Sequence, residues 1–406
     1  MASRYIRRSI EPVLLQAVGQ FPSVVLTGPR QAGKTTVLRK LLGDKFRYVS
    51  LELPDVRAAA LTDPRGFLAA FEPPVILDEI QHAPGLLPYI KADIDDNRQI
   101  AGRYVLSGSQ NLLLMEQVTE TLAGRTAILR LMPLSLRELQ GTPARPLAWE
   151  LAGEKPETAS RHIPFWDFVL TGGYPELWAS SKRSLDLWFG AYTQTYLERD
   201  VRTLRQIGDL TQFQGFLRTL AARSTGLLNL ARLAGDLGIA LNTAKAWLSV
   251  LEATHQVVVV RPYFANVGKR LVKTPRVFFT DTGLLCHLVG LKTAEHSASG
   301  PMAGALMETA VFGELYKALL AGGQEPRIYF WRTSAGTEVD FVVEIGQKLI
   351  PIEVKVSATP TPRMARAIAG LQADLPDKVS PGFVVHPGDT ALPLMPGVSS
   401  LPIARL

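Results

Sequence analysis

The sequence has one cysteine, Cys286, among 406 residues. A single thiol excludes an internal disulfide and a cysteine-built zinc site, and it fits a reducing compartment. No apolar run reaches the roughly 18 residues that span a bilayer. The basic first residues, 1–8, lack the uninterrupted apolar region of a signal peptide. We therefore expect a cytoplasmic protein with no membrane partner.

Composition excludes wholesale disorder. Hydrophobic residues make up 47% of the chain and charged residues 20%, which is ordinary for a globular protein. The length suffices for roughly two to four domains, each with its own core. The net charge of +7 favours a polyanionic partner such as nucleic acid, although composition alone leaves this open.

The strongest motif is a glycine-rich loop between a predicted strand and a predicted helix. A β-branched run at 24–27 ends in Gly-x-x-x-x-Gly-Lys-Thr, and helical spacing follows as far as Gly43. Glycines let backbone N–H groups close around phosphate oxygens, and the helix start adds a positive dipole end. Lys34 would supply a point charge and Thr35 would hold magnesium. The residues predicted to bind the nucleotide are Gly28, Pro29, Arg30, Gln31, Ala32, Gly33, Lys34, Thr35 and Thr36.

A second motif is an apolar segment, residues 75–77, that ends in two carboxylates, Asp78 and Glu79. Downstream of a phosphate loop, such a pair suits metal coordination by the first acid and activation of water by the second. We assign Asp78 to magnesium and Glu79 to the general base. A strand whose polar end simply meets solvent is the alternative.

Two weaker features follow. A predicted strand at 103–106 leads to Ser109, a candidate sensor of the γ-phosphate, with Ser107 or a plain serine–glycine turn as alternatives. Further on, Arg125 could act as a finger that reaches the ATP of a neighbouring subunit. We prefer Arg125 to Arg130, and an ion-paired surface arginine is the alternative.

A phosphate-loop strand, an acidic strand and a polar third strand together resemble the AAA+ ATPases over residues 1 to about 140. The resemblance implies ATP and Mg²⁺ as cofactors and assembly into a ring, with a hexamer as the default. Residues 5–21 are predicted to form a helix beside the first strand. Gly173-Tyr174-Pro175 resembles the lid motif of related signal-transducing ATPases, in which Pro175 would contact the nucleotide; a structural turn is the alternative.

Residues 206–285 have the pattern of a winged helix, with three predicted helices and then two β-rich runs, at 213–222, 229–237, 242–253, 256–260 and 276–279. In such a fold the third helix enters a DNA groove and the wing contacts the backbone. Winged helices also bind other proteins, so this use stays open. The candidate phosphate contacts are Lys245, Lys269, Arg270 and Lys273.

The last third of the chain contains an acidic hairpin. A two-residue turn at 346–347 joins two predicted strands. Pairing through it places Asp340 opposite Glu353 on one face of the sheet. It also places Glu338 opposite Lys355 on that face. Like charges about 5 Å apart need compensation, which a divalent cation would supply. A salt bridge between Glu338 and Lys355 beside solvated acids is the alternative.

An acid on one strand and Glu-x-Lys on the next resemble the PD-(D/E)xK nuclease superfamily. The resemblance implies that Asp340 and Glu353 hold magnesium and that Lys355 positions or activates water. It also matches Glu308, on a predicted helix at 302–320, to the superfamily's helical acid. Members that only bind DNA are expected as well, so cleavage is left open.

The whole order resembles a family of prokaryotic ATPases that pair an AAA-type domain with a C-terminal domain of unknown function having a nuclease-like core. We predict an α/β multidomain protein: an AAA+ P-loop parallel sheet (1–140), a helical lid (141–205), a winged helix (206–285) and a restriction-endonuclease-like α/β domain (286–406). The predicted function is ATP hydrolysis coupled to DNA binding or remodelling. A nucleotide-dependent switch that recruits a protein partner and an ATP-gated nuclease are the alternatives.

Overall fold

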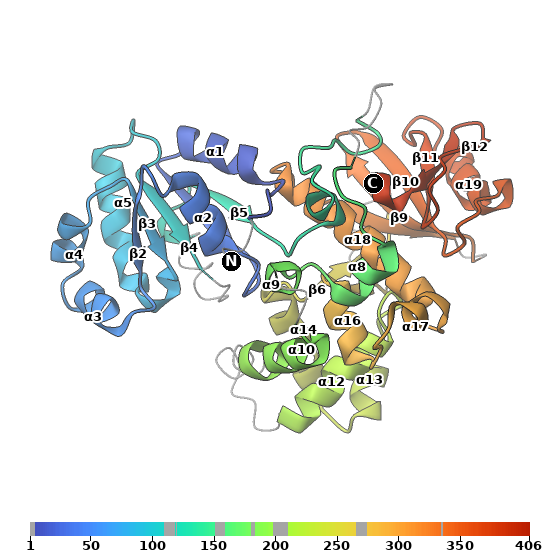
Figure 1. Ribbon diagram of the computed structural model, residues 1–406, viewed down its shortest axis with the longest axis horizontal. Helices are drawn as coiled ribbons and strands as arrows, with labels where there is room; N and C mark the ends of the chain where they lie inside the picture. The colour runs from blue at the N-terminus through green and yellow to red at the C-terminus, as the bar shows by residue number, and fades with distance from the viewer. Residues whose placement is uncertain are drawn as a thin grey trace.

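Three lobes make up the computed structural model, which describes residues 5–108, 118, 120–150, 159–179, 183–197, 210–264, 274–333 and 336–406. A β-sheet lies at each end of the molecule, and a mainly helical lobe lies beside and between them (Figure 1). Four of the predicted site residues lie outside the described residues: Ser109, Lys269, Arg270 and Lys273.

The first lobe is built on a parallel sheet of five strands. Their order is β2 (Arg47–Ser50), β3 (Val75–Asp78), β4 (Tyr104–Ser107), β1 (Ser23–Thr27) and β5 (Thr126–Arg130). β1, β3 and β4 are buried along their whole length, as expected for the continuous apolar runs of a parallel sheet. The carboxyl ends of parallel strands share one edge, so the loops after β1 and β3 meet there.

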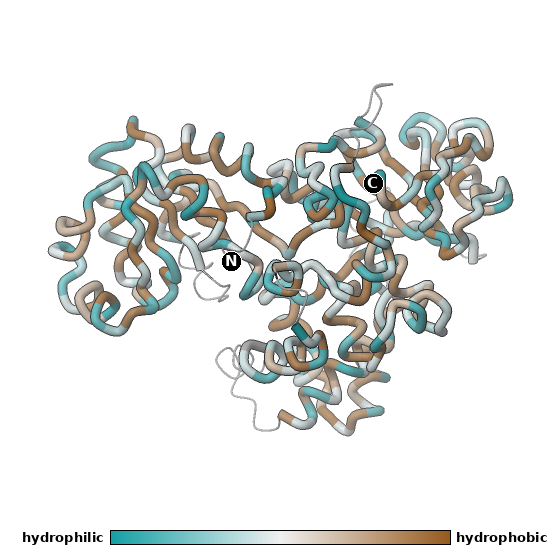
Figure 2. Tube along the Cα trace, viewed as in Figure 1, coloured by the Kyte–Doolittle hydropathy of each residue, from teal (hydrophilic) through white to brown (hydrophobic). Residues whose placement is uncertain are grey.

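Helices cover both faces of this sheet. One face packs against α1 (Glu11–Gln20) and α2 (Lys34–Leu42). The other packs against α3 (Pro54–Thr62), α4 (Pro64–Ala70), η1 (Ile80–His82), η2 (Pro84–Leu86) and α5 (Leu87–Asp96). Apolar residues gather in the strands and on the inner sides of the helices (Figure 2). No helix in the described part of the chain is long and apolar enough to cross a membrane.

The first helix is shorter than its apolar periodicity predicts. The prediction covers residues 5–21, whereas α1 begins at Glu11. Pro12 lies in the first turn, because a missing N–H and a fixed φ are tolerated there and not in a helix interior. Residues 5–10 therefore precede the helix, and they contribute to the site described below.

The second lobe is mainly helical. It contains α8 (Phe165–Thr171), α9 (Pro175–Ala179), α10 (Leu185–Tyr192), the π-helix η3 (Thr193–Leu197), α12 (Leu210–Ala222), α13 (Leu230–Asp236), α14 (Leu241–Ala253), β6 (Val257–Val260), β7 (Arg276–Phe279), α16 (Thr282–Leu288) and α17 (Ala294–Ser299). Three helices followed by the antiparallel pair β6–β7 have the predicted order. The predicted boundary between residues 285 and 286 falls inside α16.

The hairpin β6–β7 is anchored on the third lobe. Just after β6, Pro262 forms a parallel bridge with Phe330 of β8. On β7, Phe278 stacks on Phe312 of α18 with ring centroids 4.8 Å apart. One hydrophobic core runs through both lobes. The base of the predicted wing is thus fixed, and its tip, at 265–273, lies outside the described residues.

The third lobe is a mixed sheet of six strands between two helices. Its order is β12 (Pro393–Met395), β13 (Val398–Pro402), β11 (Gly382–His386), β10 (Lys348–Val354), β9 (Glu338–Ile345) and β8 (Ile328–Arg332). One face packs on α18 (Ala303–Ala321) and the other on α19 (Arg366–Asp374). β9 and β10 pair antiparallel across residues 346–347 with Ile352 opposite Phe341, which confirms the predicted hairpin and its register.

Candidate functional site

The P-loop connects β1 to α2, as the motif predicts. Gly28 (φ +142°) and Gly33 (φ +94°) adopt backbone conformations that other residues rarely adopt. A Cβ on Gly28 would lie 2.0 Å from the carbonyl oxygen of Leu131, so only glycine fits at this position. Gly33 is the N-cap of α2, and the free N–H groups of the first helical turn therefore lie at the carboxyl edge of the sheet.

The P-loop borders a cavity of about 700 Å³, a size that suits a small-molecule ligand. Pro175 of the predicted lid lines the same cavity, although it belongs to the second lobe. Its side chain lies 3.7 Å from the position that a Cβ on Gly33 would take. The predicted residues that line the cavity are Arg30, Gln31, Gly33, Lys34, Thr35, Thr36, Glu79 and Pro175.

The remaining predicted P-loop residues contribute backbone carbonyls. Lys34 is buried, and its Nζ donates to the carbonyl oxygens of Gly28 and Pro29, each at 3.0 Å. The carbonyl of Ala32 accepts a hydrogen bond from Arg8 at 2.9 Å. A phosphate is a stronger acceptor for an ammonium group than a neutral carbonyl, so Lys34 is placed to exchange these two bonds for a bound phosphate.

Asp78 lies at the end of β3 in contact with Thr35. Thr35 Oγ1 donates to Asp78 Oδ2 at 2.8 Å, and the hydroxyl of Tyr48 donates to the same oxygen at 2.6 Å. Ser107 donates to Oδ1 of Asp78. Hydroxyl and carboxylate oxygens are the ligands that Mg²⁺ prefers, so Thr35 and Asp78 fit an ion bound beside nucleotide phosphates.

Two of the partners of Asp78 act on its orientation. Ser107 is fully buried, and its hydrogen bond positions the carboxylate of Asp78; its role as a sensor of the γ-phosphate stays a prediction. Burial, followed by the hydrogen bond to Asp78, raises the pKa of Tyr48 to about 12. The phenol therefore stays protonated and keeps donating at neutral pH.

Glu79 has a different environment from the acid before it. Its backbone is in the left-handed region (φ +57°), which is strained for a residue with a side chain and is often found at functional sites. The side chain lines the cavity, and Gln81 donates to its Oε2. The structure thus separates the acidic pair into a buried carboxylate beside Thr35 and a carboxylate that borders the cavity.

Sequence reasoning missed several residues of the cavity wall. The segment before α1 contributes Tyr5 and Arg8. The predicted lid contributes Glu176 and Arg183, which pair with each other at 2.6 Å. These residues belong to no motif and reach the cavity only through the tertiary fold. The one available signal was Pro12, which indicates that residues 5–10 are not helical.

Arg125 lies at the amino end of the parallel strands, whereas the P-loop of its own chain lies at their carboxyl end. Its carbonyl accepts the N–H of Ser23, at the start of β1, and its guanidinium pairs with Asp95 at 2.6 Å. The five residues of β1, at about 3.3 Å each, separate it from the loop. A role at a neighbouring subunit's ATP stays a prediction. Arg130 lies at the other end of β5 and pairs with Glu325 at 3.7 Å.

Acidic and basic side chains meet where the second lobe joins the third. We call this group the C-terminal cluster; its members are Arg276, Glu308, Arg332, Glu338, Asp340, Glu353 and Lys355. Asp340 Oδ2 accepts the N–H of Val354 at 2.8 Å, in keeping with the predicted register. Burial, then the charge of Asp340, raises the pKa of Glu308 and that of Glu353 to about 7.

The partner of Glu338 differs from the prediction. Its carboxylate pairs with Arg276 of β7 and lies 3.7 Å from Arg332, whereas Lys355 pairs with Glu353. Arg276 also lies 3.8 Å from Glu308 of α18. A guanidinium from the second lobe therefore neutralises two acids of the third.

A register shift in β9 explains the changed partner. Tyr329 pairs with Val342, whereas Trp331 pairs with Val339, so β9 has one extra residue in this stretch. As a result, Val339 packs on the α19 side and Phe341 on the α18 side. Val339 and Phe341 therefore do not share a face of the sheet, although the regular alternation of the predicted strand places them together.

The metal ligands predicted in the third lobe all belong to the C-terminal cluster, where the charge of Asp340 acts on Glu308 and Glu353. No group of three or more carboxylate, imidazole or thiol side chains in the described ranges could hold a metal ion. The sequence predicts that a divalent cation compensates the negative charge of these acids. In the structure, Arg276 pairs with Glu338 and Lys355 pairs with Glu353. The residues predicted to hold the divalent cation were Glu308, Asp340 and Glu353.

Three families match parts of the sequence. Residues 20–140 match an AAA domain, residues 164–295 a domain of unknown function (DUF8612), and residues 303–406 another domain of unknown function (DUF4143). The first match confirms the P-loop ATPase prediction. The second spans the predicted division between lid and winged helix.

Similar proteins are found in mycobacteria. Mb2031c of Mycobacterium bovis and Rv2008c of Mycobacterium tuberculosis, both named as uncharacterized proteins, are each 31% identical over 402 residues, which are 98% of this chain and 84% of the relative. A solved structure, the Walker-type ATPase PabY2304 of Pyrococcus abyssi, is 16% identical with a TM-score of 0.45 over 70% of this chain and 96% of that one. The chain therefore belongs to the family of Mb2031c and Rv2008c, and its first lobe is an AAA-type P-loop ATPase domain.

Proposed function

We propose that this protein couples ATP hydrolysis at the P-loop to the binding or remodelling of DNA by the second lobe. Magnesium held by Thr35 and Asp78 would neutralise the triphosphate, and Glu79 would activate the attacking water. The observation that carries the coupling is the position of Pro175. It lines the nucleotide cavity, yet it begins α9 of the lobe that also contains α12–α14.

The surface of α14 supports DNA as the partner. Asn242, Lys245 and Ser249 are exposed, and their spacing places them on one side of the helix. Trp247 and Leu251 are buried on the other side. A winged helix presents the polar face of its third helix to a DNA groove, and here Lys245 is the cation on that face, with the exposed acid Glu252 one turn after Ser249. The net charge of +7 favours the same partner.

Replacing Lys245 by glutamine should weaken binding to duplex DNA and lower the slope of log K against log salt by about 0.9, the value for one phosphate contact. The measurement is a salt titration of DNA binding with and without ATP. Lys348→Gln is the matched control, because Lys348 is an exposed lysine on the third lobe. Binding without a salt slope would contradict the proposal and favour a protein partner for the same surface.

We also propose assembly into a ring, with a hexamer as the default, in which Arg125 completes the site of the next subunit. Arg125 lies at the amino end of the strands, away from the P-loop of its own chain. This position supports a role at the site of another subunit. Sedimentation with ATP and Mg²⁺ tests the assembly. A protein that turned over ATP as a monomer would contradict it.

A further inference from the structure

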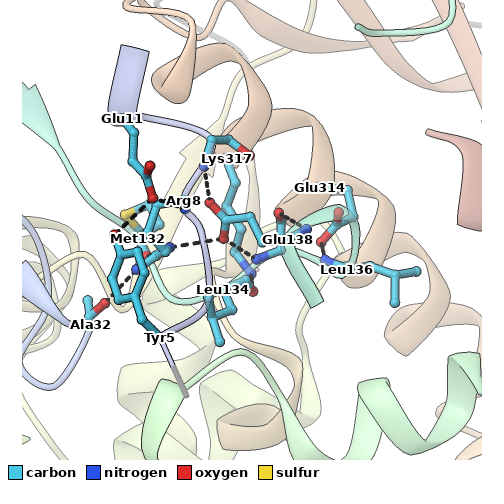
Figure 3. A network of polar contacts seen from close by, with 12 residues as sticks. Tyr5, Arg8, Glu11, Ala32, Met132, Leu134, Leu136, Glu138, Glu314 and Lys317 are labelled. Carbon is cyan, nitrogen blue, oxygen red and sulfur yellow. Dashed lines mark hydrogen bonds and ion pairs between the residues drawn. The ribbon is translucent and has the colours of Figure 1, made fainter. Parts of the chain in front are cut away.

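Arg8 ties the P-loop to the rest of the molecule (Figure 3). It is buried, and its Nη1 donates to the carbonyl of Ala32 at 2.9 Å while its Nη2 donates to that of Met132 at 2.5 Å. Its Nε lies 3.2 Å from Oε2 of Glu138. One guanidinium therefore contacts the P-loop, the segment after β5 and the helix α7 (Leu136–Leu139).

The bond to Ala32 fixes one peptide plane of the P-loop. A trans peptide unit is planar, and its C=O and N–H point to opposite sides. With the Ala32 carbonyl held by Arg8, the N–H of Gly33 is directed away from Arg8. This control matters because Gly33 has φ +94° and no side chain to restrict its rotation. In a loop of this type, backbone N–H groups bind the phosphate oxygens.

We propose that Arg8 is a positioning residue for ATP: by holding the carbonyl of Ala32, it aims the N–H of Gly33 at the phosphates. The inference rests on the ATP chemistry proposed for the P-loop. Arg8 lines the nucleotide cavity, but on this account it acts on the triphosphate through the backbone and not on the base.

Contacts with the third lobe hold Arg8 in this position. Glu138, its carboxylate partner, lies in the short helix α7, whose first N–H, that of Leu136, donates to Glu314 of α18 at 2.9 Å. Lys317, further along α18, donates to the carbonyl oxygen of Leu134, just before α7, at 3.0 Å (Figure 3). The geometry of the P-loop therefore depends on how α18 packs against residues 132–138.

The test compares the affinities of the parent protein and of Arg8→Gln for two ligands, ATP and inorganic triphosphate. Arg7→Gln is the matched control, because Arg7 is the neighbouring arginine and its side chain is 75% exposed. We expect Arg8→Gln to weaken both ligands by the same factor, roughly 10-fold, the effect of losing one hydrogen bond to a charged group. Arg7→Gln should change neither affinity.

A conservative variant adds a second readout. Arg8→Lys keeps the positive charge but lacks the planar guanidinium with its several donors, so its affinities for both ligands should lie between those of Arg8→Gln and the parent protein. If Arg8→Gln does not fold, Arg8→Lys takes its place in the comparison. Unchanged affinities for both ligands in a folded Arg8 variant would overturn the proposal. So would a loss confined to ATP, because it would place the effect at the base. A parent protein that bound neither ligand would instead refute the ATP function itself.

Discussion

ATP turnover should fall by about 100-fold or more when Glu79 is replaced by glutamine, while the affinity for ATP stays close to that of the parent protein. Glutamine keeps the size of the side chain and its carbonyl acceptor for Gln81, but it cannot take a proton from water. Because Asp78 and not Glu79 contacts Thr35, the substitution should leave metal and nucleotide binding intact. Steady-state turnover and equilibrium ATP binding, measured on the same samples, check both parts.

The control for this experiment is Glu52→Gln. Glu52 is an exposed acid that lines the same cavity, so its substitution changes the local charge equally and should leave turnover near the parent value. Lys34→Ala should abolish ATP binding, so its signal gives the background of both the binding and the turnover measurements. Full turnover by Glu79→Gln would show that another group activates the water, and loss of ATP binding would show that Glu79 holds the nucleotide.

The P-loop and the acidic strand could be predicted because their chemistry is local in the sequence. The strand before Gly28, the helix that begins at Lys34 and the acids at the end of β3 are each defined by adjacent residues. Parallel pairing then brings the two loops to one edge of the sheet. Pro175 was also predicted, but only through a resemblance, since it reaches the cavity from another lobe.

The rest of the site depends on tertiary contacts that no local pattern encodes. Arg8 was predicted to lie in a helix, and its role follows from carbonyls at Ala32 and Met132, the second more than 100 residues away. In the third lobe, the turn at 346–347 and the strand alternation were enough to predict the register of β9 and β10. They could not reveal the extra residue of β9 opposite β8, which changed the partner of Glu338.

Replacing Arg276 by methionine should lower the free energy of unfolding by about 2–3 kcal/mol, because it leaves two partly buried carboxylates without their cation. Glu338 is 19% exposed and Glu308 23% exposed, so solvent can screen their charges only in part. The guanidinium also lies over the ring of Phe330, 4.9 Å from its centroid, and methionine keeps some of that packing. Urea unfolding of the two proteins at neutral pH measures the difference.

The same carboxylate supplies the control. Arg332 lies 3.7 Å from Glu338, but its side chain is 44% exposed, so Arg332→Met should cost less than about 1 kcal/mol. Adding Glu338→Met to Arg276→Met should recover part of the lost stability, because the unpaired charge is then removed. If instead Mn²⁺ raised the urea midpoint of the nucleotide-free parent protein, and Asp340→Asn abolished that rise, the cluster would be a metal site. The acids would then have the role that the nuclease resemblance implies, and Arg276 would not be their counter-ion.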